Sequence, residues 1–141
     1  MTLRPDQLET AVDYASLREL GASLGSAGCV LLGPEDCPLT IMRYHVAVCA
    51  EESCGACPPC RIGTEVALRL LEQIEAGAAE ASDLDRLERL CRHMGATSLC
   101  EHGRNAPKTV LAGLANFRVL IEEHIATGSC PVSGATAAER G

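Results

Sequence analysis

The chain has 141 residues, 47% of them hydrophobic, which is enough for one modest core and a single domain. Its formal net charge of -7 at pH 7 excludes a nucleic-acid-binding protein, because neutralising phosphates requires clustered Lys and Arg. With no Trp, one Phe and two Tyr, the core must be built from aliphatic side chains, which favours packed helices over a β-sandwich.

Neither a signal peptide nor a membrane span is predicted. The start "MTLRPDQLET" lacks a cationic segment followed by an apolar core, and no apolar run approaches the roughly 20 residues that cross a bilayer. A cytoplasmic protein without membrane insertion is therefore expected. The nine cysteines are an odd number in a reducing compartment, so metal or cluster ligation is favoured over a disulfide framework.

The first 37 residues are expected to form an irregular arm. The segment "LRELGASLGSAGCVLLGP" predicts a short helix, a turn of small residues at 25–28 and a brief apolar strand at 29–32. A single strand leaves backbone N–H and C=O groups unpaired. The arm is therefore expected to fold over the rest of the chain or to pair with a strand of another subunit.

Four amphipathic helices are predicted to follow, at residues 38–52, 63–77, 82–95 and 107–128. The second is expected to end at Gly77 in a left-handed cap. The third is expected to open with Ser82 and Asp85 at capping-box spacing and to stop at Gly95. Because short loops join the four helices, the expected fold class is mainly all-α, a four-helix bundle.

These patterns divide the chain into three parts: an arm at 1–37, a helical bundle at 38–126 and a flexible tail at 127–141.

Three cysteines, Cys54, Cys57 and Cys60, follow the first helix at intervals of three in the segment "ESCGACPPCR". The glycine and the two prolines between them are expected to prevent regular helix, so that the backbone wraps around a compact object with its N–H groups directed towards it. A 4Fe-4S cluster suits this spacing, whereas zinc sites more often use two Cys-x-x-Cys pairs. The three thiols are therefore predicted ligands of cluster iron.

The fourth ligand has two candidates, Cys91 and Cys100. A bacterial ferredoxin run would place a fourth cysteine just after the third, but Arg61 and Ile62 occupy that space. Cys91 lies on the apolar stripe of the third helix, where a free cysteine is usually a small core residue. Cys100 lies in the loop "GATSLCEHG", which the bundle can deliver to the end that carries the first three thiols. Cys100 is the predicted fourth ligand.

Three segments carry a family resemblance: "AEESCGACPPCRIG", "SLCEHG" and "NFRVLIEEHI". With them the chain resembles the C-terminal iron-sulfur domain of the NADH-binding 51 kDa flavoprotein subunit of respiratory complex I, a domain that also occurs in NAD-linked hydrogenases and formate dehydrogenases. Residues 52–63 match a motif of that family without a gap. In the family, this motif and a distant cysteine together bind one 4Fe-4S cluster close to a flavin. The arm resembles the end of the family's ubiquitin-like ligand-binding domain, so the likeness spans roughly residues 17–125.

The resemblance implies an electron-transfer function. The family's flavin and NADH site depends on an upstream Gly-Arg-Gly-Gly loop and a nucleotide-binding domain, and neither lies in these 141 residues. One 4Fe-4S cluster is therefore expected, with no FMN or NAD on this chain, which would be non-catalytic alone. It would relay single electrons in a multi-subunit NAD(P)H-linked oxidoreductase such as a hydrogenase, formate dehydrogenase or complex I-like enzyme, with flavoprotein or other iron-sulfur subunits as partners.

Two other functions stay open. An iron-sulfur redox sensor that controls transcription would need a basic DNA-contacting segment, and none is visible. A structural zinc module would hold one zinc ion in place of the cluster.

Several further residues need an interpretation. Arg61 could offset the negative charge of four thiolates and raise the cluster potential, or it could be an exposed residue with no role. His102 is expected to be a solvent-facing loop residue and not a ligand. Because no cysteine follows Cys130, a second cluster is not expected. Buried structural thiols are expected at Cys29, Cys37 and Cys49.

Overall fold

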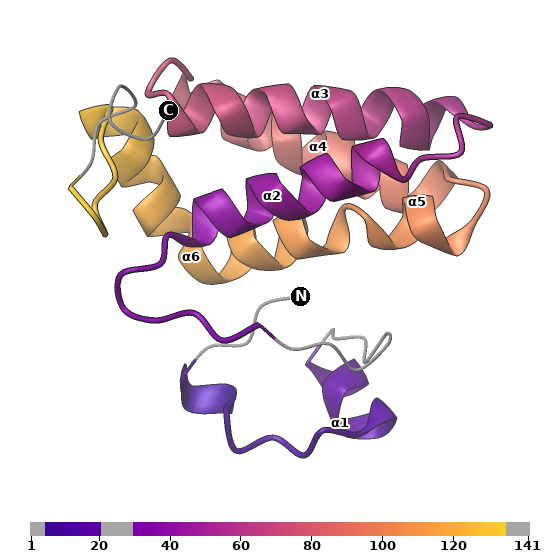
Figure 1. The fold of residues 1–141 in the computed structure, drawn as a ribbon, viewed down its shortest axis with the longest axis horizontal. Coiled ribbons are helices and arrows are strands. Elements are labelled where there is room, and N and C mark those ends of the chain that lie inside the picture. Colours follow the sequence, from indigo (N-terminus) through magenta and orange to yellow (C-terminus); the bar gives the residue numbers. More distant parts are fainter. Residues whose placement is uncertain (1–4, 21–29, 135–141) are drawn as a thin grey trace.

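The computed structural model describes residues 5–20 and 30–134 (Figure 1). Its elements are a 3₁₀ turn η1 (Pro5–Gln7) and the helices α1 (Tyr14–Glu19), α2 (Pro38–Glu51), α3 (Pro58–Glu75), α4 (Ala81–Thr97), α5 (Glu101–Asn105) and α6 (Lys108–Thr127). No β-strand is present in these ranges, so the predicted all-α class is confirmed. No helix among the described residues is long and apolar enough to span a membrane.

The strand predicted in the arm does not form at residues 30–32, which are irregular chain. Val30 and Leu31 are 76% and 82% exposed, so these side chains have no apolar layer to pack against. The remaining strand residue, Cys29, and the turn predicted at 25–28 lie outside the described residues. The short helix of the arm is present as α1, which Asp13 caps by accepting hydrogen bonds from the N–H groups of Ala15 and Ser16.

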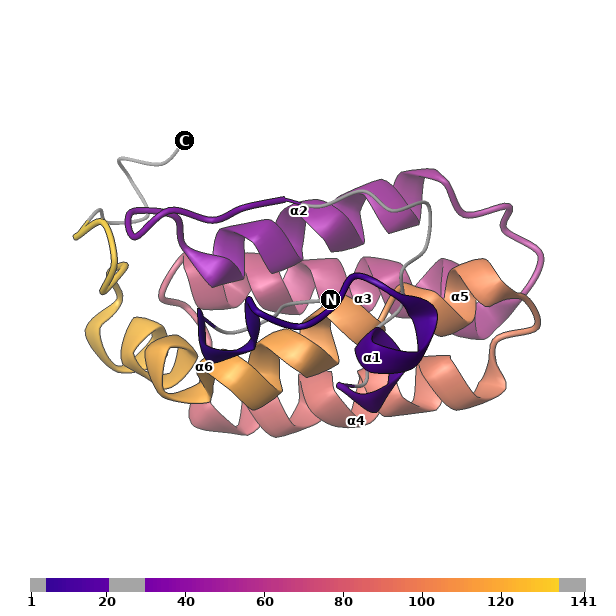
Figure 2. The same ribbon diagram turned by 90° about the horizontal axis from the view of Figure 1, so that it is seen from below.

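The helices α2, α3, α4 and α6 form the predicted four-helix bundle. Contacts join α2 to α3, α3 to α4, α4 to α6 and α6 back to α2, and two perpendicular views show the four running side by side (Figures 1 and 2). Successive long helices alternate in direction. The α2–α3 loop and the α4–α5 connection therefore lie at one end, which we call the cysteine-motif end. The start of α2 and the end of α6 lie at the opposite end.

The core between the helices is aliphatic, as the composition predicted. Every long helix contributes side chains that are almost fully buried, and they include Leu39, Met42, Val46, Leu70, Leu71, Ile74, Leu84, Leu87, Val110, Leu114 and Ile121. Cys91 lies among them with no exposed surface, which confirms it as a core residue.

The start of α3 differs from the prediction. The helix begins at Pro58, so the two prolines of the cysteine segment occupy its first two positions and Cys60 lies in its first turn. The expectation that these prolines prevent helix is wrong, because the first N–H groups of a helix have no helical acceptor and proline loses nothing there.

The limits of α4 also differ. Glu80 is its N-cap and forms a capping box with Asp83, whose Oδ2 accepts a hydrogen bond of 3.0 Å from the Glu80 N–H. The predicted capping pair of Ser82 and Asp85 lies inside the helix. The predicted stop at Gly95 is wrong as well, since α4 continues to Thr97.

Two predicted helix ends are confirmed. Gly77 follows α3 and Gly128 follows α6, each with φ of 67°. The short helix α5 was not predicted, because five residues are too few to show a helical period, and it makes Cys100 an N-cap. The division into arm, bundle and tail stays a prediction.

Candidate metal centre

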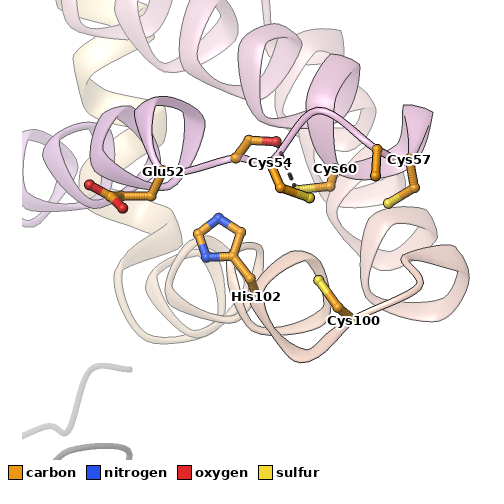
Figure 3. A pocket seen from close by; sticks show the side chains of 8 residues that line it. Glu52, Cys54, Cys57, Cys60, Cys100 and His102 are labelled. Carbon is orange, nitrogen blue, oxygen red and sulfur yellow. Dashed lines mark hydrogen bonds between the residues drawn. The ribbon is translucent and has the colours of Figure 1, made fainter.

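A cavity of about 220 Å³ lies at the cysteine-motif end (Figure 3). The residues that line it are Glu52, Ser53, Cys54, Ala56, Cys57, Cys60, Cys100 and His102. The bundle therefore brings all four cysteines singled out from the sequence to one cavity. Their assignment as ligands stays a prediction.

Local structure places each of the four thiols. Cys54 lies in the loop after α2, and Gly55 beside it has φ of 76°, a conformation in which a side chain would be strained. Cys57 is the N-cap of α3 and Cys60 lies in its first turn, and both are buried. Cys100 is exposed, like Cys54. Two thiols thus form the inner wall of the cavity and two lie at its solvent-facing rim.

Hydrogen-bond donors surround the inner thiols. Backbone N–H groups of Leu99 and Cys60 lower the pKa of Cys57 below its ordinary value, against the opposing effect of burial. The Ser53 hydroxyl oxygen lies 3.5 Å from Cys60 Sγ and accepts a hydrogen bond of 3.4 Å from the Gly55 N–H. The hydroxyl hydrogen is therefore available to the Cys60 sulfur. Such donors favour the thiolate forms that bind metals.

Arg61 stabilises the loop that carries Cys54. Its Nη1 donates a hydrogen bond of 2.9 Å to the Gly55 carbonyl. The guanidinium charge also acts to lower the pKa of Cys57, after the backbone donors. Arg61 is not among the residues that line the cavity, and its tuning of a cluster potential stays a prediction.

His102 was expected to face solvent, and this is wrong. Its ring is half-buried, lines the cavity and places Nε2 2.9 Å from the carbonyl oxygen of Cys49. Because a carbonyl only accepts hydrogen bonds, Nε2 carries the proton. His102 thereby satisfies one of the last carbonyls of α2, which lack partners within their own helix. No sequence signal marked this contact, which depends on how α5, packed against α3, α4 and α6, lies beside the end of α2.

Cys91 differs from the cavity thiols in position and in chemistry. It lies inside the core, and burial raises its pKa to about 12. A thiol with this pKa stays neutral at physiological pH, whereas a metal ligand must be deprotonated.

The spacing of the cavity thiols is wider than a single zinc ion requires. A tetrahedral zinc with Zn–S distances of about 2.3 Å holds its sulfurs about 3.8 Å apart. In the described part of the chain, no three of the four cavity thiols lie within 4.8 Å of one another. The described residues therefore show no preformed zinc-sized group of thiols at this end.

The helix α5 packs closely against the wall of the cavity that Cys60 forms. A Cβ atom at Gly103 would lie 2.7 Å from Ser98 and 3.0 Å from Cys60. The Ser98 hydroxyl is buried and has no hydrogen-bond partner among the described residues, but Ser98 is not among the residues that line the cavity.

An all-α bundle with four thiols around a cavity at one end defines a class of metal- or cluster-binding helical domains. Residues 40–124 match the model of the family described as "NADH-ubiquinone oxidoreductase-F iron-sulfur binding region", and the chain belongs to this family.

Similar proteins include subunits of hydrogenases and quinone oxidoreductases. The chain is 33% identical over 130 residues to the NADP-reducing hydrogenase subunit HndC of Solidesulfovibrio fructosivorans, covering 92% of this chain and 26% of that protein. It is 36% identical over 125 residues to an NADH-quinone oxidoreductase subunit of Rhizobium meliloti, covering 89% of this chain and 30% of that protein.

A solved structure shares the fold. It is the crystal structure of NAD+-reducing [NiFe]-hydrogenase in the H2-reduced state, with a TM-score of 0.64 and 34% identity over 67% of this chain and 16% of that chain. The chain thus spans less than a third of the length of each of these proteins.

Proposed function

We propose that this chain is an electron-transfer module that holds one 4Fe-4S cluster through Cys54, Cys57, Cys60 and Cys100. The observation that carries the proposal is the convergence of these four thiols on one cavity within the family's iron-sulfur binding region. The module would relay single electrons within a multi-subunit NAD(P)H-linked oxidoreductase.

The residues of the cavity have distinct tasks in this proposal. A bound cluster supplies reversible one-electron exchange. Cys57 and Cys60 anchor it against the start of α3, where backbone N–H groups and the Ser53 hydroxyl offset thiolate charge. His102 and Gly103 hold α5 against α2 and Cys60, which keeps Cys100 at the rim. The exposed rim leaves this end open to a second redox centre.

The partners are proposed from the relatives. HndC and the quinone oxidoreductase relative are both named as subunits, which supports partner subunits in general. A flavoprotein or another iron-sulfur protein as the neighbour of this module stays the prediction made from the family resemblance. Flavin and NAD(H) would bind elsewhere in such an assembly. The cytoplasmic location stays a prediction.

Metal analysis tests the cluster. Anaerobically purified chain is expected to contain about four iron and four sulfide per molecule and to give a 4Fe-4S electron paramagnetic resonance signal on reduction. The proposal would be contradicted if the wild-type chain contained zinc in place of iron and a Cys54→Ser variant lost that zinc. This result would favour the structural zinc module.

A further inference from the structure

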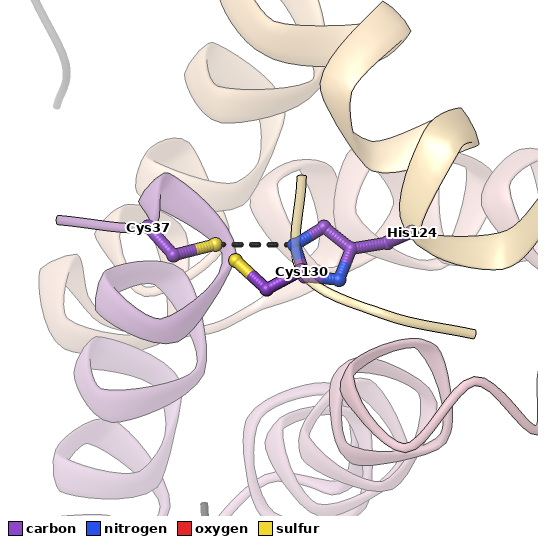
Figure 4. Close-up of side chains that lie close together, drawn as sticks. All are labelled: Cys37, His124 and Cys130. Carbon is purple, nitrogen blue, oxygen red and sulfur yellow. Dashed lines mark hydrogen bonds between the residues drawn. The ribbon is translucent and has the colours of Figure 1, made fainter. Parts of the chain in front are cut away.

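A second group of metal-binding side chains lies at the opposite end of the bundle (Figure 4). The ligand atoms of Cys37, His124 and Cys130 all lie within 4.8 Å of one another, and among the described residues this is the only such group of three. Cys37 Sγ is 3.2 Å from His124 Nε2. None of the three residues takes part in the cavity at the cysteine-motif end.

Three separate segments deliver these side chains. Cys37 is the N-cap of α2, His124 lies in the last turn of α6, and Cys130 follows the left-handed residue Gly128 that ends α6. His124 and Cys130 are each 1% exposed, and Cys37 is half-buried. The site is thus preformed by the bundle and reachable from the Cys37 side.

The two sulfurs differ in their backbone surroundings. Cys37 is the N-cap of α2, but its side chain makes no capping hydrogen bond there. The Ser133 N–H is 3.5 Å from Cys130 Sγ. Cys130 therefore has an outer hydrogen bond of the kind that metal-bound thiolates use.

We propose that Cys37, His124 and Cys130 form a zinc site that is separate from the iron-sulfur site. Two thiolates and one imidazole are a donor set that zinc prefers, and sulfurs of a tetrahedral zinc site stand about 3.8 Å apart, within the spacing of this group. On binding, Zn²⁺ displaces the two thiol protons to solvent and no electrons are transferred. Three protein ligands leave the fourth position to water or to a ligand from outside these residues.

The zinc would act as a cross-link between distant parts of the chain. It joins the N-cap of α2 to the last turn of α6 and to the loop that follows. The start of α2 and the end of α6 would then be held together by the zinc ion, whatever happens at the cysteine-motif end. This inference does not depend on the proposed electron-transfer function.

The test uses the full chain, purified anaerobically with a thiol reductant and dialysed against one equivalent of Zn²⁺. About one zinc per chain is expected, and its X-ray absorption spectrum should show sulfur neighbours near about 2.3 Å and nitrogen near about 2.0 Å in a two-to-one ratio. Cys37→Ser should lose this zinc while keeping its helix content, because serine is a favoured N-cap residue. Cys130→Ser, which changes a residue outside the helices, should lose it as well.

Two matched variants separate this site from the other thiols. Cys54→Ser should lose iron and keep the zinc, and Cys91→Ala should keep both. Added zinc should raise the thermal midpoint of the wild-type chain and leave that of Cys37→Ser unchanged. The proposal is overturned if the wild-type chain takes up no zinc or if either ligand variant retains it. It is also overturned if mass spectrometry of the chain, isolated from cells and alkylated without prior reduction, finds Cys37 and Cys130 joined in a disulfide.

Discussion

The chemistry of each cysteine in this chain is set by what surrounds its sulfur. Cys91 has only core side chains around it and a pKa of about 12, so it stays a neutral thiol. Cys57 faces two backbone N–H groups, and its pKa lies below the ordinary value. The difference of environment separates a core residue from a candidate ligand, although both side chains are buried.

The ligand assignment predicts unequal effects of two substitutions. Cys100→Ser should lose the 4Fe-4S signal or most of its iron, because no other thiol lines the cavity besides the three of the motif. Cys91→Ala should keep the full signal and lower only the stability of the fold. Iron content and electron paramagnetic resonance after reduction measure both. An unchanged signal in Cys100→Ser, together with its loss in Cys91→Ala, would reverse the assignment.

Gly103 is predicted to be required for the packing of α5. In Gly103→Ala the new Cβ would lie 2.7 Å from Ser98 Cβ and 3.0 Å from Cys60 Cβ, so α5 must shift. Overpacking of this kind costs about 1–3 kcal/mol in the free energy of unfolding, and the displaced Cys100 should lower cluster occupancy. Denaturant unfolding and iron content are the measurements.

Gly95→Ala is the matched control, since it adds a methyl group to a glycine inside α4 whose nearest neighbours would be 3.8 Å away. It should be neutral or stabilise the helix by roughly 0.5–1 kcal/mol. Equal losses in the two variants would show that α5 does not pack against Cys60 as described.

Part of the site could be predicted from residues alone. The three motif cysteines are close in sequence, so their convergence is a local property, and Cys100 follows once four helices and their loops are recognised. The contact of His102 with the Cys49 carbonyl and the approach of Gly103 to Cys60 depend on side-chain packing, which no periodicity encodes. The convergence of Cys37, His124 and Cys130 is likewise a property of the closed bundle. Cys37, taken singly, has the sequence context of a structural thiol, and nothing in the sequence links it to Cys130 or His124.

At the scale of elements, helix existence was predictable and helix limits were not. Apolar residues at helical spacing identified all four long helices. The starts depend on which side chain captures the first N–H groups: Glu80 with Asp83 at α4, and a cysteine followed by two prolines at α3. Several residues near each helix start could have acted as the N-cap, and the sequence alone does not show which of them does.

The capping box of α4 predicts a position-specific loss of stability. Asp83→Ala removes the acceptor of the Glu80 N–H and should lower the free energy of unfolding by about 1 kcal/mol. Ser82→Ala, one residue earlier and exposed inside the helix, should change it by less than about 0.5 kcal/mol. Chemical denaturation of the two variants measures the difference. A larger loss in Ser82→Ala would restore the capping pair expected from the sequence.

At the scale of the whole molecule, the long helices alternate in direction, so the α2–α3 loop and the start of α2 lie at opposite ends of one bundle (Figure 1). The cavity thiols belong to the first of these ends, and Cys37 and Cys130 belong to the second. Among the described residues, Cys91 is the one cysteine in the buried core cluster between them. We therefore expect the two ends to respond separately to loss of their ligands. In hydrogen exchange of Cys54→Ser, faster exchange is expected in the α2–α3 loop and α5, with the end of α6 unchanged. Faster exchange spread evenly over the bundle would contradict this separation.

In the proposed relay, electrons would leave the module through the surface of the cysteine-motif end. A relay with one centre works only when another centre comes close, so the proposed partner must cover the cysteine-motif end. Leu99, next to Cys100, is 74% exposed there, and an exposed apolar side chain at such a position suits a protein contact. Leu99→Glu should therefore weaken co-purification with the redox partner at least about tenfold, equivalent to about 1.4 kcal/mol, while iron content stays unchanged.

Val119→Glu is the control, because Val119 is 71% exposed on α6 and away from the cavity. The measurement is tagged purification from the native cells, with partners identified by mass spectrometry and by their flavin or iron. If Leu99→Glu retains the same partners in the same yield while Val119→Glu loses them, the partner covers the side of α6 and not the end that carries the thiols.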